Sequence, residues 1–277
     1  MPELPEVETA RRFLAEHLLG RQLLGVDITC EQLRWPIDRE ISEDLPGARI
    51  TAVERRAKYL LLETNRGVAI SHLGMSGRWE VHNAAANAPP RGRHDHVDLT
   101  FDGGLLARYH DPRRFGALLW GGDSPNEHPR LAEIGPEPWG GVEPDEIAEH
   151  LWECARGRKI PLRDFLLDGR VIAGVGNIYA SEAAFRAGIR PMIAAGRISR
   201  PRYRRLATAI ESVLAESIER GGTTLRDFQD PLGNAGRYGD RCQVYGREGE
   251  SCDRCGGTIR RRVRQARSLY FCPGCQS

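Results

Sequence analysis

The chain has 277 residues, of which 28% are charged and 40% are hydrophobic, and its formal net charge is +2 at pH 7. This composition excludes a collagen-like fibre and an intrinsically disordered chain. No stretch approaches the roughly 18 apolar residues of a membrane span, and the amino terminus lacks the basic and then apolar layout of a signal peptide. We therefore expect a cytoplasmic protein with no membrane partner, whose length favours two domains or one domain with an appendage.

The first predicted element is an amphipathic helix over residues 5–19. Pro5 suits a first helical turn and Gly20 suits a C-cap. Between them, apolar residues recur at helical intervals at Val7, Ala10, Leu14 and Leu18. Pro2 stands just ahead of this helix, where the positive end of the helix dipole favours a neutral amine.

Pro2 is the most unusual feature of this end of the chain. If Met1 is removed, Pro2 carries a free secondary amine with a pKa of about 8, which makes it a usable nucleophile at neutral pH. Attack on a sugar aldehyde carbon would give an iminium cation, which draws electrons from the neighbouring C–H bond. The residues alone leave two interpretations open: lyase chemistry on a sugar, or two prolines that only stiffen a chain end.

From about residue 22 to residue 120 the pattern changes to short strands. Turns such as Asn65-Arg66-Gly67 and Asp102-Gly103-Gly104 separate them. No helical pattern intervenes, so seven or eight strands in this region predict an antiparallel β-sandwich or barrel. The predicted strands are Leu23–Thr29, Ile50–Glu54, Tyr59–Glu63, Val68–His72, Trp79–Val81, His96–Phe101 and Leu105–Tyr109.

Residues 121–144 are rich in Gly and Pro and are interpreted as a connection between domains, after which helical periodicity returns. Ser199 is the expected N-cap of the longest helix, which Gly221-Gly222 would end. The other predicted helices are Asp145–Ala155, Leu162–Leu167 and Ser181–Ala187, and residues 223–245 are expected to form a loop.

Four of the seven cysteines form two CxxC pairs sixteen residues apart: Cys252, Cys255, Cys272 and Cys275. In a reducing compartment this spacing favours zinc over disulfides. Two such pairs suit the corners of a zinc tetrahedron, and a site of four thiolates is closed, so we expect one structural Zn²⁺. The alternative is four reduced structural cysteines.

The segment between the cysteine pairs, Gly256–Phe271, is a predicted hairpin that is dense in arginine. Residues 241–277 contain eight arginines against Glu248, Glu250 and Asp253, a local excess of five positive charges. A rigid hairpin that carries guanidinium groups suits the phosphates or base edges of a duplex, although solubility alone explains part of such a charge.

Other candidate features are weaker by themselves. Gly174-Val175-Gly176-Asn177 precedes a predicted helix and could approach a phosphate, but a glycine-rich turn between packed helices is commoner. No strand precedes it, which disfavours a dinucleotide site. Lys58 could donate a proton or bind phosphate, or simply be solvated. The run Asp111–Phe115 holds two arginines and an aromatic ring that could fill a gap in a base stack, or Phe115 could belong to the core.

Taken together, nine stretches resemble the bacterial formamidopyrimidine-DNA glycosylases, in that family's order, from residue 1 to residue 276. They are MPELPEVET (1–9), RRAKYLLLE (55–63), SHLGMSG (71–77), HDHVDL (94–99), DPRRFG (111–116), GVGNIYASE (174–182), GGTTLRDF (221–228), VYGREG (244–249) and the cysteine pairs.

The resemblance implies a multidomain α+β fold: an N-terminal antiparallel β-sandwich with a leading helix, a helix–two-turn–helix domain and a zinc finger. We expect the catalytic sandwich at residues 1–125, the interdomain linker, helix–two-turn–helix domain and lesion loop at 126–240, and the zinc-finger hairpin at 241–277.

The resemblance also implies roles for individual residues. Pro2 would be the Schiff-base nucleophile, Glu3 its general acid, Lys58 the proton donor for β-elimination, and Arg267 the group that serves δ-elimination and binds phosphate. Backbone phosphates would be bound by Asn177, His94, Arg113 and Arg158. Met75, Arg113 and Phe115 would fill the space left by the extruded nucleotide, since base extrusion costs a few kcal/mol.

The sequence departs from the family pattern in two places. The loop at 229–240 reads QDPLGNAGRYGD where a stretch like Pro-Gly-Tyr-Phe is common, so we expect Arg237 and Tyr238 to alter lesion preference or loop order. Arg158 and Arg163 stand where lysines are frequent, which keeps the charge but presents it as a planar fork.

The resemblance therefore predicts a monomeric enzyme that acts on damaged double-stranded DNA in the cytoplasm and associates with the nucleoid through it. It would excise oxidised purines, such as 8-oxoguanine and formamidopyrimidines, and then cleave the strand by β,δ-elimination. Three alternatives stay open: the sister enzyme for oxidised pyrimidines, a zinc-ribbon DNA-binding protein without catalysis, and a duplicate that has lost activity.

Overall fold

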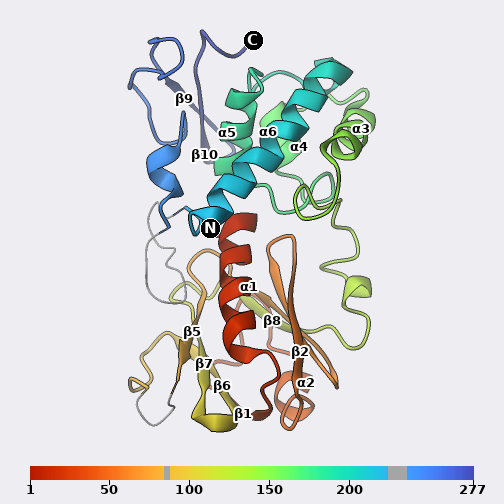
Figure 1. The fold of residues 1–277 in the computed structure, drawn as a ribbon, viewed down its shortest axis with the longest axis vertical. Helices are drawn as coiled ribbons and strands as arrows, with labels where there is room; N and C mark the ends of the chain where they lie inside the picture. The colour runs from red at the N-terminus through yellow and green to blue at the C-terminus, as the bar shows by residue number, and fades with distance from the viewer. Residues whose placement is uncertain (84–87, 224–235) are drawn as a thin grey trace. The chain divides into compact units, whose positions relative to one another are not determined.

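The structure is a computed structural model that describes residues 1–83, 88–223 and 236–277, and Figure 1 shows its fold. The chain divides into two compact units. The first unit is Met1–Glu133 with Gly221–Gly236, and the second is Ile134–Arg220 with Arg237–Ser277. Within the described ranges, no helix is both long and apolar enough to cross a membrane.

The first unit begins with helix α1 (Leu4–Leu18), which confirms the predicted amphipathic helix to within one residue at each end. Glu3 is the N-cap and Leu19 the C-cap, and Gly20 follows with φ of +76°, a conformation that favours glycine. The apolar face of α1, including Val7, Leu14 and Leu18, is buried in the core of the first unit.

Two four-stranded antiparallel sheets form the rest of this unit, which confirms the predicted sandwich (Figure 1). One sheet has the order β1-β6-β7-β5 and the other β2-β3-β4-β8. Side chains from both sheets and from α1 share one hydrophobic core, which includes Leu60, Trp79 and Tyr109. The strands are β1 (Leu23–Ile28), β2 (Ile50–Arg56), β3 (Tyr59–Thr64), β4 (Gly67–His72), β5 (Arg78–His82), β6 (Asp95–Phe101), β7 (Leu106–His110) and β8 (Ala117–Trp120), with a short helix α2 (Glu40–Glu43) between β1 and β2.

The second unit is helical. Helix α6 packs against both α3 and α5, and α5 also contacts α4. Its helices are α3 (Pro144–Ala155), α4 (Leu162–Leu166), α5 (Asn177–Arg186) and α6 (Arg200–Glu219). The predicted helices match these except at one start: α5 begins at Asn177, four residues before the expected Ser181. Ser199 is the N-cap residue of α6, as expected, but its hydroxyl makes no capping hydrogen bond.

The carboxyl-terminal part of this unit is the predicted hairpin, formed by β9 (Arg260–Arg264) and β10 (Arg267–Phe271) in antiparallel register. Leu269 and Phe271 of β10 are buried, and β10 contacts α5. The five residues of β9 are all exposed. The hairpin therefore fixes its second strand against the helices and leaves its arginine-rich strand accessible.

Candidate active site and zinc site

The candidate nucleophile lies one residue before the N-cap of α1. Pro2 is buried, whereas Met1 is 52% exposed. Glu3 and Glu6 form a reciprocal capping box, in which the Glu3 N–H donates to Glu6 Oε2 at 2.7 Å and the Glu3 carboxylate accepts from the Glu6 N–H. The cap fixes the direction in which the chain enters the helix, and so sets Pro2 directly before the cap residue Glu3 at this helix end.

A buried carboxylate fastens α1 to the turn that carries Lys58. Glu8 is 4% exposed and accepts from Arg55 Nε at 3.2 Å through Oε2. Arg55 in turn donates through Nη1 to the Ala57 carbonyl at 3.1 Å. Ala57 and Lys58 form the two-residue turn between the paired residues Arg56 and Tyr59, and Ala57 has φ of +53°. The chain from Glu8 through Arg55 thus ties the Lys58 turn to the helix that Pro2 precedes.

His72 lies near Lys58 and was not assigned a role from the sequence. Burial, followed by the charges of Lys58 and Arg34, lowers the pKa of His72 from 6.5 to about 4, so the ring is neutral at physiological pH. Its Nδ1 accepts the Gly74 N–H at 2.9 Å, and its ring lies 4.7 Å from that of Tyr59, centroid to centroid. A neutral ring at His72 therefore adds no positive charge of its own beside the Lys58 ammonium.

Two turns bring Met75, Arg113 and Phe115 into one region of the first unit. Ser76 donates to Asp111 Oδ1 at 2.7 Å, and the fully buried Asp111 also accepts from the Gly116 N–H at 2.8 Å. A Cβ on Gly74, which has φ of +62°, would lie 2.3 Å from the Phe115 carbonyl carbon, so only glycine permits this approach. The Arg113 guanidinium lies 5.0 Å from the centroid of the Phe115 ring, which is 44% exposed.

His94 lies on the wall of a cavity of about 400 Å³ in the same unit. The His94 carbonyl accepts the Asp111 N–H at 2.9 Å, which connects His94 to the turn of Arg113. Arg91, Arg93 and Arg114 also line this cavity, so its wall is basic. The structure therefore places His94 and Arg113 on adjoining segments.

Asn177 and Arg267 are brought together in the second unit. Asn177 is the first residue of α5, and its Nδ2 donates to the Ser268 carbonyl of β10 at 2.7 Å and to the Tyr245 hydroxyl at 3.3 Å. Ser268 follows Arg267, whose side chain is exposed. The Asn177 Oδ1 is buried and has no hydrogen-bond partner among the described residues. Arg158 is exposed elsewhere in this unit, with its guanidinium 5.5 Å from the centroid of the Phe165 ring.

Two further buried glutamates hold segments of the site in place. Glu182 of α5 is fully buried and accepts three backbone N–H groups, from Gln243, Val244 and Tyr245, at 2.8, 3.0 and 2.8 Å. Glu6 accepts the Thr223 N–H through Oε1 at 2.7 Å, in addition to its capping bond. Thr223 directly precedes the segment 224–235, which lies outside the described residues and includes most of the expected lesion loop at 229–240.

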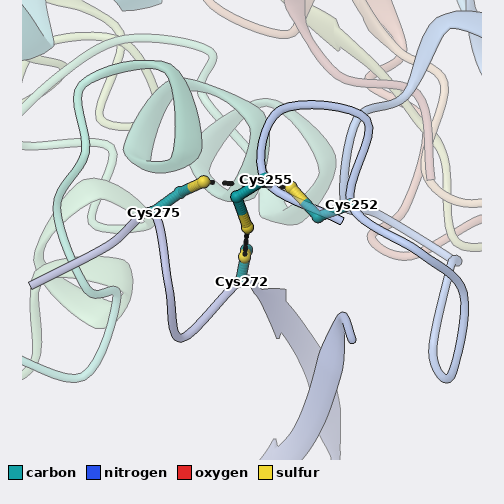
Figure 2. A group of neighbouring side chains, drawn as sticks. All are labelled: Cys252, Cys255, Cys272 and Cys275. Carbon is teal, nitrogen blue, oxygen red and sulfur yellow. Dashed lines mark hydrogen bonds between the residues drawn. The ribbon is translucent and has the colours of Figure 1, made fainter. Parts of the chain in front are cut away.

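The four cysteines of the two CxxC pairs converge as the spacing predicts (Figure 2). Their sulfur atoms all lie within 4.8 Å of one another; Cys252 and Cys275 are 3.9 Å apart, and Cys255 and Cys272 are 3.4 Å apart. Sulfurs at about 2.3 Å from a tetrahedral zinc would be roughly 3.8 Å apart, so the four thiolates fit Zn²⁺. With four protein ligands the site is closed, and its one zinc is structural.

The zinc site is built into the fold of the second unit. Cys252 and Cys272 pack with Phe185, Val244 and Ile259 in one hydrophobic cluster. The side chain of Gln276 accepts the Cys272 N–H at 2.8 Å and donates to the Ile189 carbonyl at 2.8 Å. Metal binding therefore holds both ends of the arginine-rich hairpin and anchors them to the helices.

Comparison with known proteins agrees along the whole chain. Residues 1–118 match the formamidopyrimidine-DNA glycosylase N-terminal domain, residues 134–229 the H2TH domain of the same enzymes, and residues 249–277 the zinc finger found in FPG and IleRS. A formamidopyrimidine-DNA glycosylase of Methylococcus capsulatus is 50% identical over 276 residues, with 100% of both chains covered.

Solved structures agree with this match. The Lactococcus lactis Fpg in complex with DNA that contains an abasic site has a TM-score of 0.86 and 31% identity, over 99% of each chain. The MutM (FPG) protein of Thermus thermophilus has a TM-score of 0.85 and 38% identity, over 99% of this chain and 98% of the other. The chain belongs to the formamidopyrimidine-DNA glycosylase family.

Proposed function

We propose that this member of the formamidopyrimidine-DNA glycosylase family uses Pro2 as its nucleophile to excise oxidised purines from damaged duplex DNA. The protein is a DNA glycosylase and abasic-site lyase of base excision repair, with one structural zinc. A single observation carries the assignment of the nucleophile: Pro2 directly precedes Glu3, the residue that caps α1, in a chain that matches the family from end to end.

The reaction requires the Pro2 nitrogen to be free of Met1. The amine of Pro2 attacks C1′ of the damaged nucleotide, the glycosidic bond breaks, and the base leaves with a proton. Glu3 is the acid that serves the opening of the sugar, and an iminium forms between Pro2 and C1′. In β-elimination a proton leaves C2′ and the C3′–O bond breaks, so that the 3′ phosphate departs, with Lys58 as the proton donor. In δ-elimination a proton leaves C4′ and the C5′–O bond breaks, so that the 5′ phosphate departs, and Arg267 assists this step. Water then releases Pro2.

The remaining site residues bind DNA in this proposal. His94, Arg113, Arg158 and Asn177 contact backbone phosphates, which fix the position of the duplex without reading its sequence. Met75, Arg113 and Phe115 fill the gap left by the extruded nucleotide, and the Ser76–Asp111 bond holds the two turns that carry them together. The Asn177 Oδ1, which is buried and meets no hydrogen-bond donor within the described part of the chain, supports a polar ligand near this residue.

We further propose that the sandwich of residues 1–125, the linker and helix–two-turn–helix region of residues 126–240, and the zinc-finger hairpin of residues 241–277 are the working domains. The protein acts as a monomer in the cytoplasm, where it associates with the nucleoid through DNA. Equilibrium sedimentation with and without a short damaged duplex tests the monomer, and a second protomer in the complex would contradict it.

Borohydride trapping on a duplex with one 8-oxoguanine tests the nucleophile. Protein whose mass shows loss of Met1 should give a covalent complex and β,δ-elimination products. A variant with one residue inserted between Met1 and Pro2 should give neither, while it binds an uncleavable abasic-site analogue within about twofold of the native affinity. Efficient trapping by the extended variant would exclude Pro2.

A substrate panel distinguishes a purine-specific glycosylase from the pyrimidine-specific alternative. A panel that compares release of 8-oxoguanine with release of thymine glycol should favour the purine. Preferential release of thymine glycol would assign the chain to oxidised pyrimidines with its chemistry unchanged. Normal DNA binding without cleavage of any damaged substrate would contradict catalysis altogether.

A further inference from the structure

The short helix α4 presents two charged residues to the turn of the arginine-rich hairpin, within the second unit. Arg163 is 1% exposed, and its Nη2 donates to the carbonyl of Arg264 at 3.1 Å. Arg264 in turn donates through Nε to Asp164 Oδ2 at 2.6 Å. The Arg163 Nε lies 3.1 Å from Asp164 Oδ1, so that three charged residues, with the backbone carbonyl of Arg264 as one link, form a closed ring at the end of β9.

The turn that this ring holds is a strained one. Gln265 and Ala266 connect β9 to β10 with φ of +49° and +56°. A two-residue turn with positive φ at both positions is usually made by Asn and Gly, because other residues meet a steric penalty there. Neither residue of this turn is of that kind, so contacts outside the turn must hold its conformation.

Arg267 stands directly across the hairpin from Arg264, as their register shows. Side chains opposite each other in an antiparallel pair lie on one face, and two like charges in that position repel. Asp164 supplies the negative charge beside Arg264. Burial and the charges of Arg267 and Arg264 lower the pKa of Arg163, against the opposing effect of Asp164, so these groups act on one another.

We propose that Arg163 and Asp164 form a clamp that fixes the hairpin turn and thereby positions Arg267 for the second elimination. The clamp rests on the role proposed above for Arg267. Arg163 and Asp164 act through the turn and are positioning residues. The geometry points to a specific consequence: loosening the clamp impairs the δ-elimination and leaves Schiff-base formation at Pro2 intact.

The test uses the zinc-loaded full chain with Met1 removed, on a duplex with one abasic site under single turnover. Asp164→Asn and Arg264→Gln should each lower the ratio of β,δ- to β-elimination product roughly tenfold, since misplacing a reacting group by about 1 Å costs up to a hundredfold. Borohydride trapping and zinc content should stay within about twofold of native. The double variant should lose no more than either single variant, because both remove the same bond.

Asp145→Asn is the matched control, since the side chain of Asp145 is 83% exposed and pairs with Arg204 at 3.8 Å in the same unit. Arg163→Lys keeps the charge without the planar fork and should give an intermediate ratio. The clamp is overturned if Asp164→Asn has the same ratio of β,δ- to β-elimination product as Asp145→Asn. It is also overturned if borohydride trapping by Asp164→Asn falls as much as the product ratio does. Arg267→Gln tests the role of Arg267 itself. If this variant keeps the native ratio of β,δ- to β-elimination product, the proposed role of Arg267 is rejected. If Arg267→Gln lowers that ratio but Asp164→Asn keeps it native, only the clamp is rejected.

Discussion

Replacing Glu8 with Gln should destabilise the first unit and weaken catalysis together. Glu8 and Arg55 have side chains that are 5% and 6% exposed, and Glu8 also pairs with Arg11 and Arg12, whose side chains are 24% and 50% exposed. Breaking a buried pair by removing one charge costs about 3–5 kcal/mol, whereas exposed pairs contribute about 1 kcal/mol or less. Because the amide oxygen of Gln can still accept one bond, we expect a loss of about 2–4 kcal/mol in the free energy of unfolding.

The pH dependence of this loss identifies its cause. Burial raises the pKa of Glu8, but hydrogen bonds and charges from Arg11, Arg12 and Arg55 outweigh burial and hold it below 4.5. A carboxyl whose pKa is lower in the folded protein than in the unfolded chain stabilises the fold fully when the pH is above its unfolded pKa. That stabilisation is lost as the pH falls through its folded pKa. The difference between native protein and Glu8→Gln should therefore be constant near neutral pH and shrink below pH 4.5.

Urea unfolding at neutral pH and again at acidic pH measures this difference, and Trp79 in the core of the first unit serves as a reporter. Glu16→Gln, an exposed position on the same helix, is the matched control. The β-elimination product should form more slowly in Glu8→Gln, because the Lys58 turn loses its tie to α1. A variant within about 0.5 kcal/mol of the control, or a difference that is the same at both pH values, would refute the reasoning.

Three other outcomes are expected. Removing zinc with a chelator should abolish duplex binding, because the metal holds both ends of the hairpin, and unchanged affinity in a binding titration would contradict this. Glu182→Ala removes the acceptor of three N–H groups, those of the half-buried Gln243 and Tyr245 and of the buried Val244, and the buried group alone costs about 1–3 kcal/mol. The variant should speed zinc release in a colorimetric assay, whereas Ala at the exposed Glu219 should not. Burial lowers the pKa of His72 to about 4, so between pH 6.5 and 4 the ring is protonated in the unfolded chain but neutral in the folded protein. The free energy of unfolding should therefore decrease as the pH falls from 6.5 to 4. The folded and unfolded pKa values differ by about 2.5, which limits the loss to about 3–4 kcal/mol. A His72→Asn variant whose stability has the same slope against pH as the native protein would count against this cause.

The sequence predicts elements well where local pattern and burial agree. Helix α1 follows its apolar periodicity, seven strands lie at the short apolar or alternating runs between turn residues, and the cysteine spacing predicts the metal site. Strand β8 was outside the predicted strands: it has four residues, and its antiparallel pairing with β4 defines it. The start of α5 was misplaced because Ile178 and Tyr179 are weak helix formers, and their burial decides the conformation instead.

The arrangement of the site depends on contacts that no local pattern contains. Glu8 meets Arg55 across 47 residues, Ser76 meets Asp111 across 35, and Asp164 meets Arg264 across 100. Periodicity shows which face of a helix is apolar, but it does not identify the partner of a charge. For this reason the roles of Pro2 and Arg267 could be proposed from resemblance, whereas the groups that hold their segments in place could not.

One feature of the sequence does indicate where such a holding contact is made. Glu182 falls inside an almost entirely apolar helix, where every described residue from Ile178 to Phe185 is buried. An ionised group at such a position is costly unless several donors meet it, so it requires a partner segment. The three N–H groups of residues 243–245 satisfy that requirement, and the hydrophobic cluster around two zinc ligands includes Val244. A carboxylate on an apolar helix face therefore marks the place where a distant segment is attached, and here that segment leads into the zinc finger.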